Sequence, residues 1–154
     1  MMRLRAIAVF LLLCAGATGA GAVERLTGQD IRQLFEGNTV AGRYSNGPPF
    51  SEYHHKDGRV TGHNRHVNNT DACWTTTEDA VCYYYGPHET RRTYCFWVER
   101  SGTLYVLRTY RSGRINGVAT IQPGDSEKHA AKAPPWHCDG LISQHPGGAR
   151  LAGR

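Results

Sequence analysis

The chain has 154 residues and a formal net charge of +5, from 18 Lys and Arg against 13 Asp and Glu. This length suits one domain and is short for two. The basic residues are scattered among acidic ones and form no longer run than Arg91-Arg92, so the basic stripe that nucleic-acid binding requires is missing. We therefore expect no nucleic-acid partner.

Residues 1–22 have the three-part pattern of a secretory signal peptide. A short basic start precedes an apolar run over residues 6–15, and Ala20-Gly21-Ala22 places small residues where signal peptidase reads the chain. This pattern predicts cleavage before Val23. The apolar run is shorter than the roughly 20 residues that cross a bilayer, so it does not predict a membrane anchor.

Removal of the signal sets the charge and the compartment of the mature chain. Loss of Arg3 and Arg5 lowers the formal charge from +5 to +3. Lipid attachment at Cys14 is an alternative, but Leu13 precedes it where lipoprotein processing requires a small residue. We expect a secreted or periplasmic protein without a membrane span.

The segment 27–36 predicts one short helix. Thr27 is a good N-cap, and Asp30 three residues later supplies the acidic partner of a capping box. The apolar side chains of one helix face are Ile31, Leu34 and Phe35. Gly37-Asn38 follows as a left-handed stop, so the helix should end near Glu36.

From residue 39 to residue 121, short strand-like runs alternate with turn signals such as Asp57-Gly58 and Ser112-Gly113. The expected strands lie near residues 39–44, 50–55, 60–66, 72–77, 80–85, 93–99, 103–110 and 114–121. The predicted fold class is all-β with one short N-terminal helix. It is an antiparallel eight-stranded β-meander that either closes into a small barrel or stays open as a curved sheet.

The composition divides the mature chain into residues 23–121, the β-meander domain, and residues 122–154. The second part is rich in Pro, Gly, Ala and charged residues and has few apolar side chains to bury. It predicts a flexible, largely disordered tail. Residues 136–142 are an exception, because they carry apolar side chains and the last cysteine.

Four cysteines follow the signal: Cys73, Cys82, Cys95 and Cys138. An even number in a secreted chain predicts two disulfides, and the absence of C-x-x-C argues against a redox pair or a zinc knuckle. If the fifth and sixth expected strands pair, Cys82 lies opposite Cys95, near disulfide reach. The remaining pair, Cys73–Cys138, would then tie the tail to the sheet.

The same hairpin carries a candidate binding surface of aromatic residues. Side-chain alternation puts Tyr84 and Trp97 on the face of the cysteines, and Tyr83 and Tyr85 on the other face. Tyr and Trp are frequent in binding hot spots, whereas ordinary sheet packing is the alternative because tyrosine favours strands. If the barrel closes around an aromatic cavity for a hydrophobic ligand, we expect Trp97 and Tyr84 at its wall.

A histidine-rich hairpin is the candidate metal site. Folding residues 52–66 around Asp57-Gly58 pairs Glu52 with His63. Glu52, His54 and His63 then share one face as a set of two histidines and one carboxylate. The set depends on that register, since a slip of one residue moves side chains to opposite faces. An ordinary polar outer face is the alternative.

Catalytic motifs are missing from the sequence. There is no G-x-S-x-G and no glycine-rich phosphate loop leading into a helix. The carboxylates are too dispersed to nominate a catalytic pair; they are Glu36, Glu52, Asp71, Asp79 and Glu99. We nominate no catalytic residue and no cofactor, and we expect a protein that is not an enzyme.

Four segments occur in a recognisable order: LTGQDIRQLFEGNTVAG, FSEYHHKDGRVTG, DAVCYYY and YCFWVERSGTLYVL. Over about residues 26–121 this order resembles a family of small secreted or periplasmic proteins of Gram-negative bacteria, a domain of unknown function. The resemblance implies a short helix followed by a β-meander, an envelope location and a Cys82–Cys95 bridge. Cys73, Cys138 and the tail depart from the family pattern. The resemblance carries no activity or catalytic residue across.

Together these features predict a non-enzymatic secreted or periplasmic binding or accessory protein. Its partner would be an envelope protein or a small ligand. The two alternatives are a periplasmic metal-binding protein that uses the histidine hairpin and a carrier of a small hydrophobic ligand.

Overall fold

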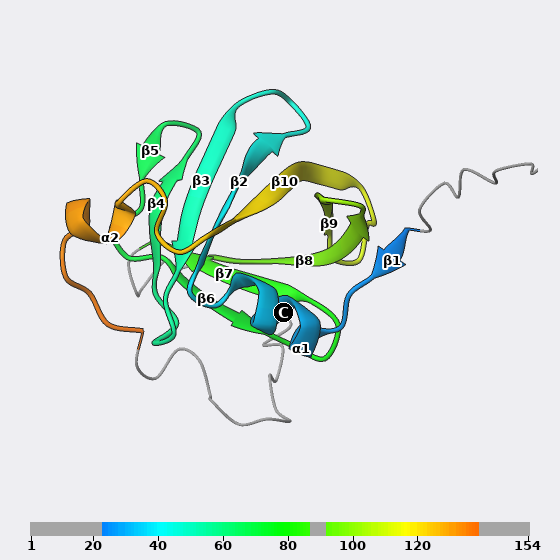
Figure 1. Cartoon of the computed structure of the whole chain (residues 1–154), viewed down its shortest axis with the longest axis horizontal. Helices are drawn as coiled ribbons and strands as arrows, with labels where there is room; N and C mark the ends of the chain where they lie inside the picture. Colours follow the sequence, from blue (N-terminus) through cyan, green and yellow to red (C-terminus); the bar gives the residue numbers. More distant parts are fainter. Residues whose placement is uncertain (1–22, 87–91, 139–154) are drawn as a thin grey trace, which may run out of the picture.

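The computed structural model describes residues 23–86 and 92–138, with two helices, α1 (Gly28–Phe35) and α2 (His129–Lys132) (Figure 1). The strands are β1 (Glu24–Arg25), β2 (Asn38–Tyr44), β3 (Pro49–His54), β4 (Val60–Asn64), β5 (Val67–Asn68), β6 (Cys73–Thr76), β7 (Val81–Tyr85), β8 (Arg92–Ser101), β9 (Leu104–Thr109) and β10 (Ile115–Pro123). The predicted all-β class with one N-terminal helix is confirmed.

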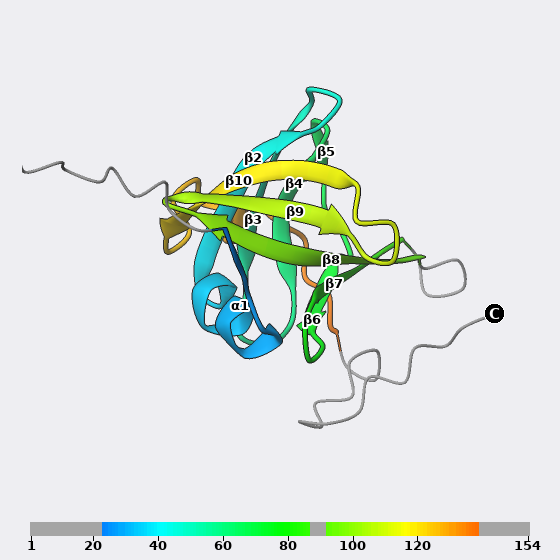
Figure 2. The same cartoon turned by 90° about the vertical axis from the view of Figure 1, so that its right-hand side faces the viewer.

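The strands form one antiparallel sheet in the order β5-β4-β3-β2-β10-β9-β8-β7-β6, and β1 pairs with β8 outside this path. Two meanders, β2–β5 and β6–β10, are joined by the long pairing of β2 with β10. The sheet curls into a half-barrel, whose curvature Figure 2 shows from the side.

The two margins of the half-barrel meet at one end. The Val60 N–H donates to the Ala72 carbonyl oxygen at 2.9 Å, and the Trp74 N–H donates to the Gly58 carbonyl oxygen at 2.7 Å. These bonds join the start of β4 to the start of β6. The half-barrel is therefore bridged near this end, and the margins separate toward β5.

Helix α1 lies at the bridged end of the sheet (Figure 1). Thr27 caps it as predicted: its hydroxyl accepts from the Asp30 N–H at 3.2 Å, and Asp30 accepts from the Thr27 N–H at 3.0 Å. Ile31 and Phe35 are fully buried. The core between the helix and the inner face of the sheet consists of Leu26, Ile31, Phe35, Val40, Phe50, Val60, Ala72, Trp74, Val81, Tyr83, Val98, Tyr105, Leu107 and Ala119.

One predicted strand differs from the structure. The expected run 60–66 ends at Asn64, and the chain turns back into β5. Arg65 and His66 make this turn with φ values of 50° and 69°, a left-handed conformation that a strand does not contain. Residues 67–71 follow this turn and lie where the two margins of the half-barrel are separated.

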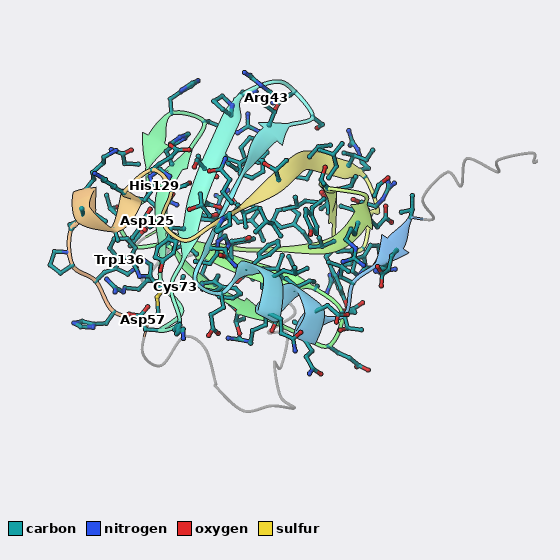
Figure 3. All side chains as sticks on the ribbon, viewed as in Figure 1. Arg43, Asp57, Cys73, Asp125, His129 and Trp136 are labelled. Carbon is teal, nitrogen blue, oxygen red and sulfur yellow. A yellow bond between two sulfur atoms is a disulfide. The ribbon has the colours of Figure 1, made fainter. Side chains whose placement is uncertain are left out.

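The first part of the predicted tail is packed on the half-barrel. Strand β10 continues to Pro123, and the Thr39 hydroxyl donates to the Gly124 carbonyl oxygen at 2.7 Å. Figure 3 shows His129 beside β3 and β4, and Trp136 near Cys73. The Trp136 indole N–H donates to the Ala72 carbonyl oxygen at 3.0 Å. Composition underestimated this packing because it rests on a few specific contacts and one disulfide.

Both predicted disulfides are confirmed. Cys82 pairs with Cys95 directly across β7 and β8, with their Cα atoms 4.1 Å apart. Cys73 on β6 pairs with Cys138, with a Cα separation of 5.8 Å. Two such bridges are typical of proteins that fold outside the cytoplasm. None of the helices in residues 23–86 and 92–138 has the length and apolar character needed to cross a membrane.

Candidate functional site

A pocket of about 580 Å³ opens inside the half-barrel, where its margins separate. This volume lies within the range of roughly 300–1,000 Å³ that is usual for small-molecule sites. The lining side chains come from opposite strands and from the segment after β4; they are Tyr44, Phe50, Glu52, Asn64, Arg65, Val67, Asn68, Asn69, Thr70, Asp71, Tyr83, Tyr85, Tyr94, Phe96, Leu107 and Asn116.

Strand alternation places the central residue of the pocket. Phe50, Glu52 and His54 are successive inward positions of β3 because side chains on one face recur every two residues. His54 lies in the core below, and Phe50 and Glu52 line the pocket. Glu52 is 4% exposed, so a carboxyl group sits at the boundary between the apolar core and the pocket.

Three neutral donors converge on a single oxygen of Glu52. Its Oε1 accepts from the Asn69 amide at 2.7 Å, the Asn64 amide at 2.8 Å and the Tyr85 hydroxyl at 2.8 Å. Asn64 and Asn69 flank the turn after β4, whereas Tyr85 lies on β7 across the opening. These bonds hold the carboxyl group in one orientation between the two margins.

The other oxygen, Oε2, accepts no hydrogen bond from the residues that the structure describes. Among the described residues, the buried side-chain nitrogen or oxygen without a hydrogen-bond partner is His63 Nδ1, not Glu52 Oε2. Since Oε2 also has no partner, it is not fully buried and is accessible from the pocket that Glu52 lines. Glu52 also takes part in none of the ion pairs found within the described ranges. Its carboxyl group therefore offers one free acceptor and forms no ion pair with a cationic side chain of residues 23–86 and 92–138.

Burial controls the ionisation of this site. It raises the pKa of the Glu52 carboxyl above its usual range, while the hydrogen bonds from Tyr85, Asn69 and Asn64 act in the opposite direction. Burial also raises the pKa of Tyr44, Tyr83 and Tyr85, and the Glu52 carboxylate raises it further. The three tyrosines thus remain neutral phenols.

Aromatic rings form the walls around Glu52. Tyr83 and Tyr85 stack with their ring centroids 6.0 Å apart, and Tyr94 lies 6.0 Å from Tyr85. Phe96 lies 6.1 Å from Tyr83. These rings occupy the inward positions of β7 and β8, so they continue the apolar core upward into the pocket.

Two charged residues line the pocket in addition to Glu52. Arg65 is an exposed residue of the turn after β4, and its guanidinium lies over the ring of Tyr44, 4.6 Å from the ring centroid. Asp71 lies at the end of the same segment and is half-buried. The ionisable group deep in the pocket is therefore the carboxyl group of Glu52.

The predicted metal set does not form, because the hairpin register is one residue away from the expected one. Glu52 faces Gly62, and His63 faces Ser51. The His55 N–H donates to the Arg59 carbonyl oxygen at 2.9 Å, which makes a three-residue loop where a two-residue turn was expected. Within the described residues, no three His, Cys, Asp or Glu side chains are grouped so that they could hold a metal ion.

The two candidate histidines lie on opposite faces of the sheet. His54 is fully buried, with Nδ1 3.1 Å from the Glu52 carbonyl oxygen and Nε2 2.9 Å from the Tyr83 hydroxyl. His63 lies on the outer face below α2, with its ring centroid 5.9 Å from that of His129. His129 Nε2 in turn lies 2.8 Å from Ser51 Oγ. Neither histidine lines the pocket.

The predicted aromatic binding residues divide between the two faces. Tyr83 and Tyr85 line the pocket. Tyr84 and Trp97 share the outer face with the cysteines, so the expectation that they would line a cavity is wrong. Trp97 instead donates to Asp79 Oδ2 at 2.9 Å and lies under the Arg25 guanidinium at 3.8 Å.

Sequence reasoning missed the donors Asn64 and Asn69. Asn64 could have been found, because it is the next inward position after Gly62 on β4, but only with the correct register. Asn69 has no periodic signal, since it follows the left-handed turn and reaches Glu52 through the tertiary fold.

No protein-family model matches the chain, and searches of the curated proteins and of the solved structures found no match. The resemblance to a Gram-negative envelope family therefore stays a prediction. What the chain does is argued below from the pocket.

Proposed function

We propose that the protein binds a small, largely apolar molecule in the pocket of its half-barrel and acts as a carrier or binding protein outside the cytoplasm. The observation that carries this proposal is a pocket of about 580 Å³ lined by aromatic rings from opposing strands around one buried carboxyl group. Among the three readings of the sequence, this observation favours the ligand carrier.

The composition of the pocket supports binding rather than core packing. Small-molecule sites combine mostly apolar walls with a few fixed polar groups. Here Tyr83, Tyr85 and Phe96 supply the walls, and Glu52 is held by three hydrogen bonds. A side chain that only filled the core would gain nothing from carrying an ionisable group to this depth.

The compartment is part of the same proposal. The signal-like segment and the two disulfides support secretion or a periplasmic location with cleavage before Val23. We propose binding without catalysis, because the described residues that line the pocket include no His, Lys or Cys that could act as a base or nucleophile beside Glu52, and burial raises the pKa of the neighbouring Tyr83 and Tyr85.

The test is a titration of the purified mature protein with N-phenyl-1-naphthylamine, a neutral apolar dye whose fluorescence increases in apolar surroundings. We expect saturable binding of one dye per chain and a raised midpoint of thermal unfolding, since a ligand that binds only the folded state stabilises it. Absence of saturable binding would refute the proposed function.

Two tyrosines of one hairpin provide a matched pair of variants. Tyr94 lines the pocket, whereas Tyr84 lies on the opposite face. We expect Tyr94→Ala to weaken dye binding about tenfold, in line with the loss of one aromatic contact, and Tyr84→Ala to leave it within about twofold. Equal losses in the two variants would place the dye outside the pocket.

A further inference from the structure

The carboxyl group in the pocket has an unusual set of neighbours. Its three donors, Asn64, Asn69 and Tyr85, are neutral, and all of them bind Oε1. The described residues pair Glu52 with no Lys, Arg or His. Burial of a carboxylate without a counter-ion is unfavourable, so buried carboxylates are usually paired with a cation or bound to a metal or ligand.

The free oxygen points to what a ligand would contribute. Oε2 lacks a donor among the described residues, and Glu52 lines the pocket. A donor on the ligand would complete the carboxyl group, and a positively charged donor would also offset its charge. Bonds between an ammonium group and a carboxylate are about twice as strong as neutral ones.

The surrounding rings favour the same kind of ligand. The face of an aromatic ring carries a negative potential and attracts cations within about 6 Å of its centroid. Tyr83, Tyr85, Tyr94 and Phe96 form an adjoining series of such rings beside Glu52. By contrast, Arg65, the cationic residue of the described lining, is exposed, and its guanidinium already lies over Tyr44. The interior of the pocket therefore suits a cation and disfavours an anion.

We propose that the pocket selects a small organic ammonium ion, which donates an N–H to Glu52 Oε2 while its apolar part lies against Tyr83, Tyr85 and Phe96. This inference rests on the proposed function and specifies the class of ligand. A fatty acid or other carboxylate would bring a like charge next to Glu52 and is disfavoured.

Three probes of matched shape test the class. 2-Phenylethylamine, 2-phenylethanol and 3-phenylpropionate share a ring and a short chain, and they end in an ammonium, a hydroxyl and a carboxylate. By calorimetric titration at pH 7 we expect the amine to bind at least about tenfold more tightly than the alcohol, because close charge pairs at interfaces contribute about 1.5 kcal/mol or more. The carboxylate should bind most weakly.

Glu52→Gln gives the decisive variant. A glutamine can keep its oxygen at the position of Oε1, where the same three donors bind it, and it puts an NH₂ group in place of Oε2. The fold is thus retained, which circular dichroism checks, while the acceptor becomes a donor. We expect the preference for the amine over the alcohol to fall to within about twofold and binding of the alcohol to persist.

Glu78→Gln is the matched control, because it makes the same substitution and removes the same unit charge at an exposed residue outside the pocket lining. We expect it to keep the tenfold preference. Equal loss of preference in both variants would overturn the pairing with Glu52 in favour of a general electrostatic effect. If the dye and the alcohol bind but the amine binds no more tightly, the ammonium inference fails alone. If none of the probes or the dye binds, the proposed function fails with it.

Discussion

Two successive inward residues of β3 show how much a change of depth alters an ionisable side chain. Glu52 opens into the pocket, whereas His54 is enclosed by rings, with Phe35 at 5.1 Å and Trp74 at 5.0 Å between centroids. The His54 Nδ1–H donates to the Glu52 carbonyl oxygen, and the His54 Nε2 accepts from the Tyr83 hydroxyl. Both nitrogens are thus satisfied in the neutral form.

His54 makes the fold sensitive to acid. Burial lowers its pKa to about 3, whereas the unfolded chain has the ordinary value of 6.5. Between these values the unfolded state binds a proton that the folded state does not, so the unfolding free energy falls as the pH falls. We expect His54 to contribute a slope of up to about 1.4 kcal/mol per pH unit in this window.

Urea denaturation of the native protein and of His54→Gln from pH 7 to pH 4 measures this contribution. The advantage of the native protein over the variant should shrink toward low pH. His137→Gln, at an exposed position, provides the background. A constant difference between native protein and His54→Gln would contradict the assigned burial.

At the scale of elements, the seating of α1 closes the core at the bridged end of the half-barrel. The Gly28 N–H donates to the Glu78 carbonyl oxygen at 2.8 Å, and the helix start lies directly against the β6–β7 turn. A Cβ atom at Gly28 would lie 1.7 Å from the Thr77 carbonyl oxygen. The residue type at this position is thus set by the approach of two backbones.

Gly28→Ala should therefore displace α1 from the turn, although alanine has the higher helix propensity. We expect a loss of about 3 kcal/mol in unfolding free energy, at the upper end of what overpacking costs. Gln29→Ala, one residue later on the exposed side, should change stability by less than about 0.5 kcal/mol. Chemical denaturation of both variants decides, and similar stabilities would show that the helix start can shift freely.

At the scale of the whole molecule, the two disulfides differ in what they constrain. Cys82–Cys95 closes a sequence separation of 13 residues within one hairpin, whereas Cys73–Cys138 closes one of 65 residues. The second bridge fixes the C-terminal segment to β6, next to the place where the two margins of the sheet meet. It therefore ties the C-terminal segment to β6, the strand at one margin of the half-barrel.

The chain-entropy account predicts different losses when each bridge is removed. Replacing both cysteines by alanine should cost about 4 kcal/mol for Cys73–Cys138 and about 3 kcal/mol for Cys82–Cys95. Guanidinium denaturation of the two double variants under non-reducing conditions measures the difference. A larger loss from the hairpin bridge would show that local packing of β7 on β8 outweighs loop closure.

Most of the fold could be predicted from the sequence because its signals are local. The capping box of Thr27 and Asp30 marks the helix, glycine turns separate the strands, and the pairing of two neighbouring strands places Cys82 opposite Cys95. These features act through neighbours in the chain or across one hairpin. The predicted start of β6 and the end of β10 are close to those of the structure for the same reason.

The site depended on details that a local pattern does not contain. The loop between His55 and Arg59 has three residues instead of the expected two-residue turn, and the resulting register places His63 opposite Ser51, on the other face from Glu52. Likewise, alternation predicts that Tyr83 and Tyr84 lie on opposite faces of the sheet. Neither residue indicates which of the two faces is concave.

By itself, the sequence determined the all-β class, the helix, the pairing of the cysteines and the expectation of secretion, since each follows from periodicity, turn chemistry or spacing. Only the tertiary structure decided that the sheet curls, that its margins meet at one end, and that Asn64, Asn69 and Tyr85 converge on Glu52. Curvature and convergence arise from contacts between strands that are distant in the chain, and no single segment encodes them.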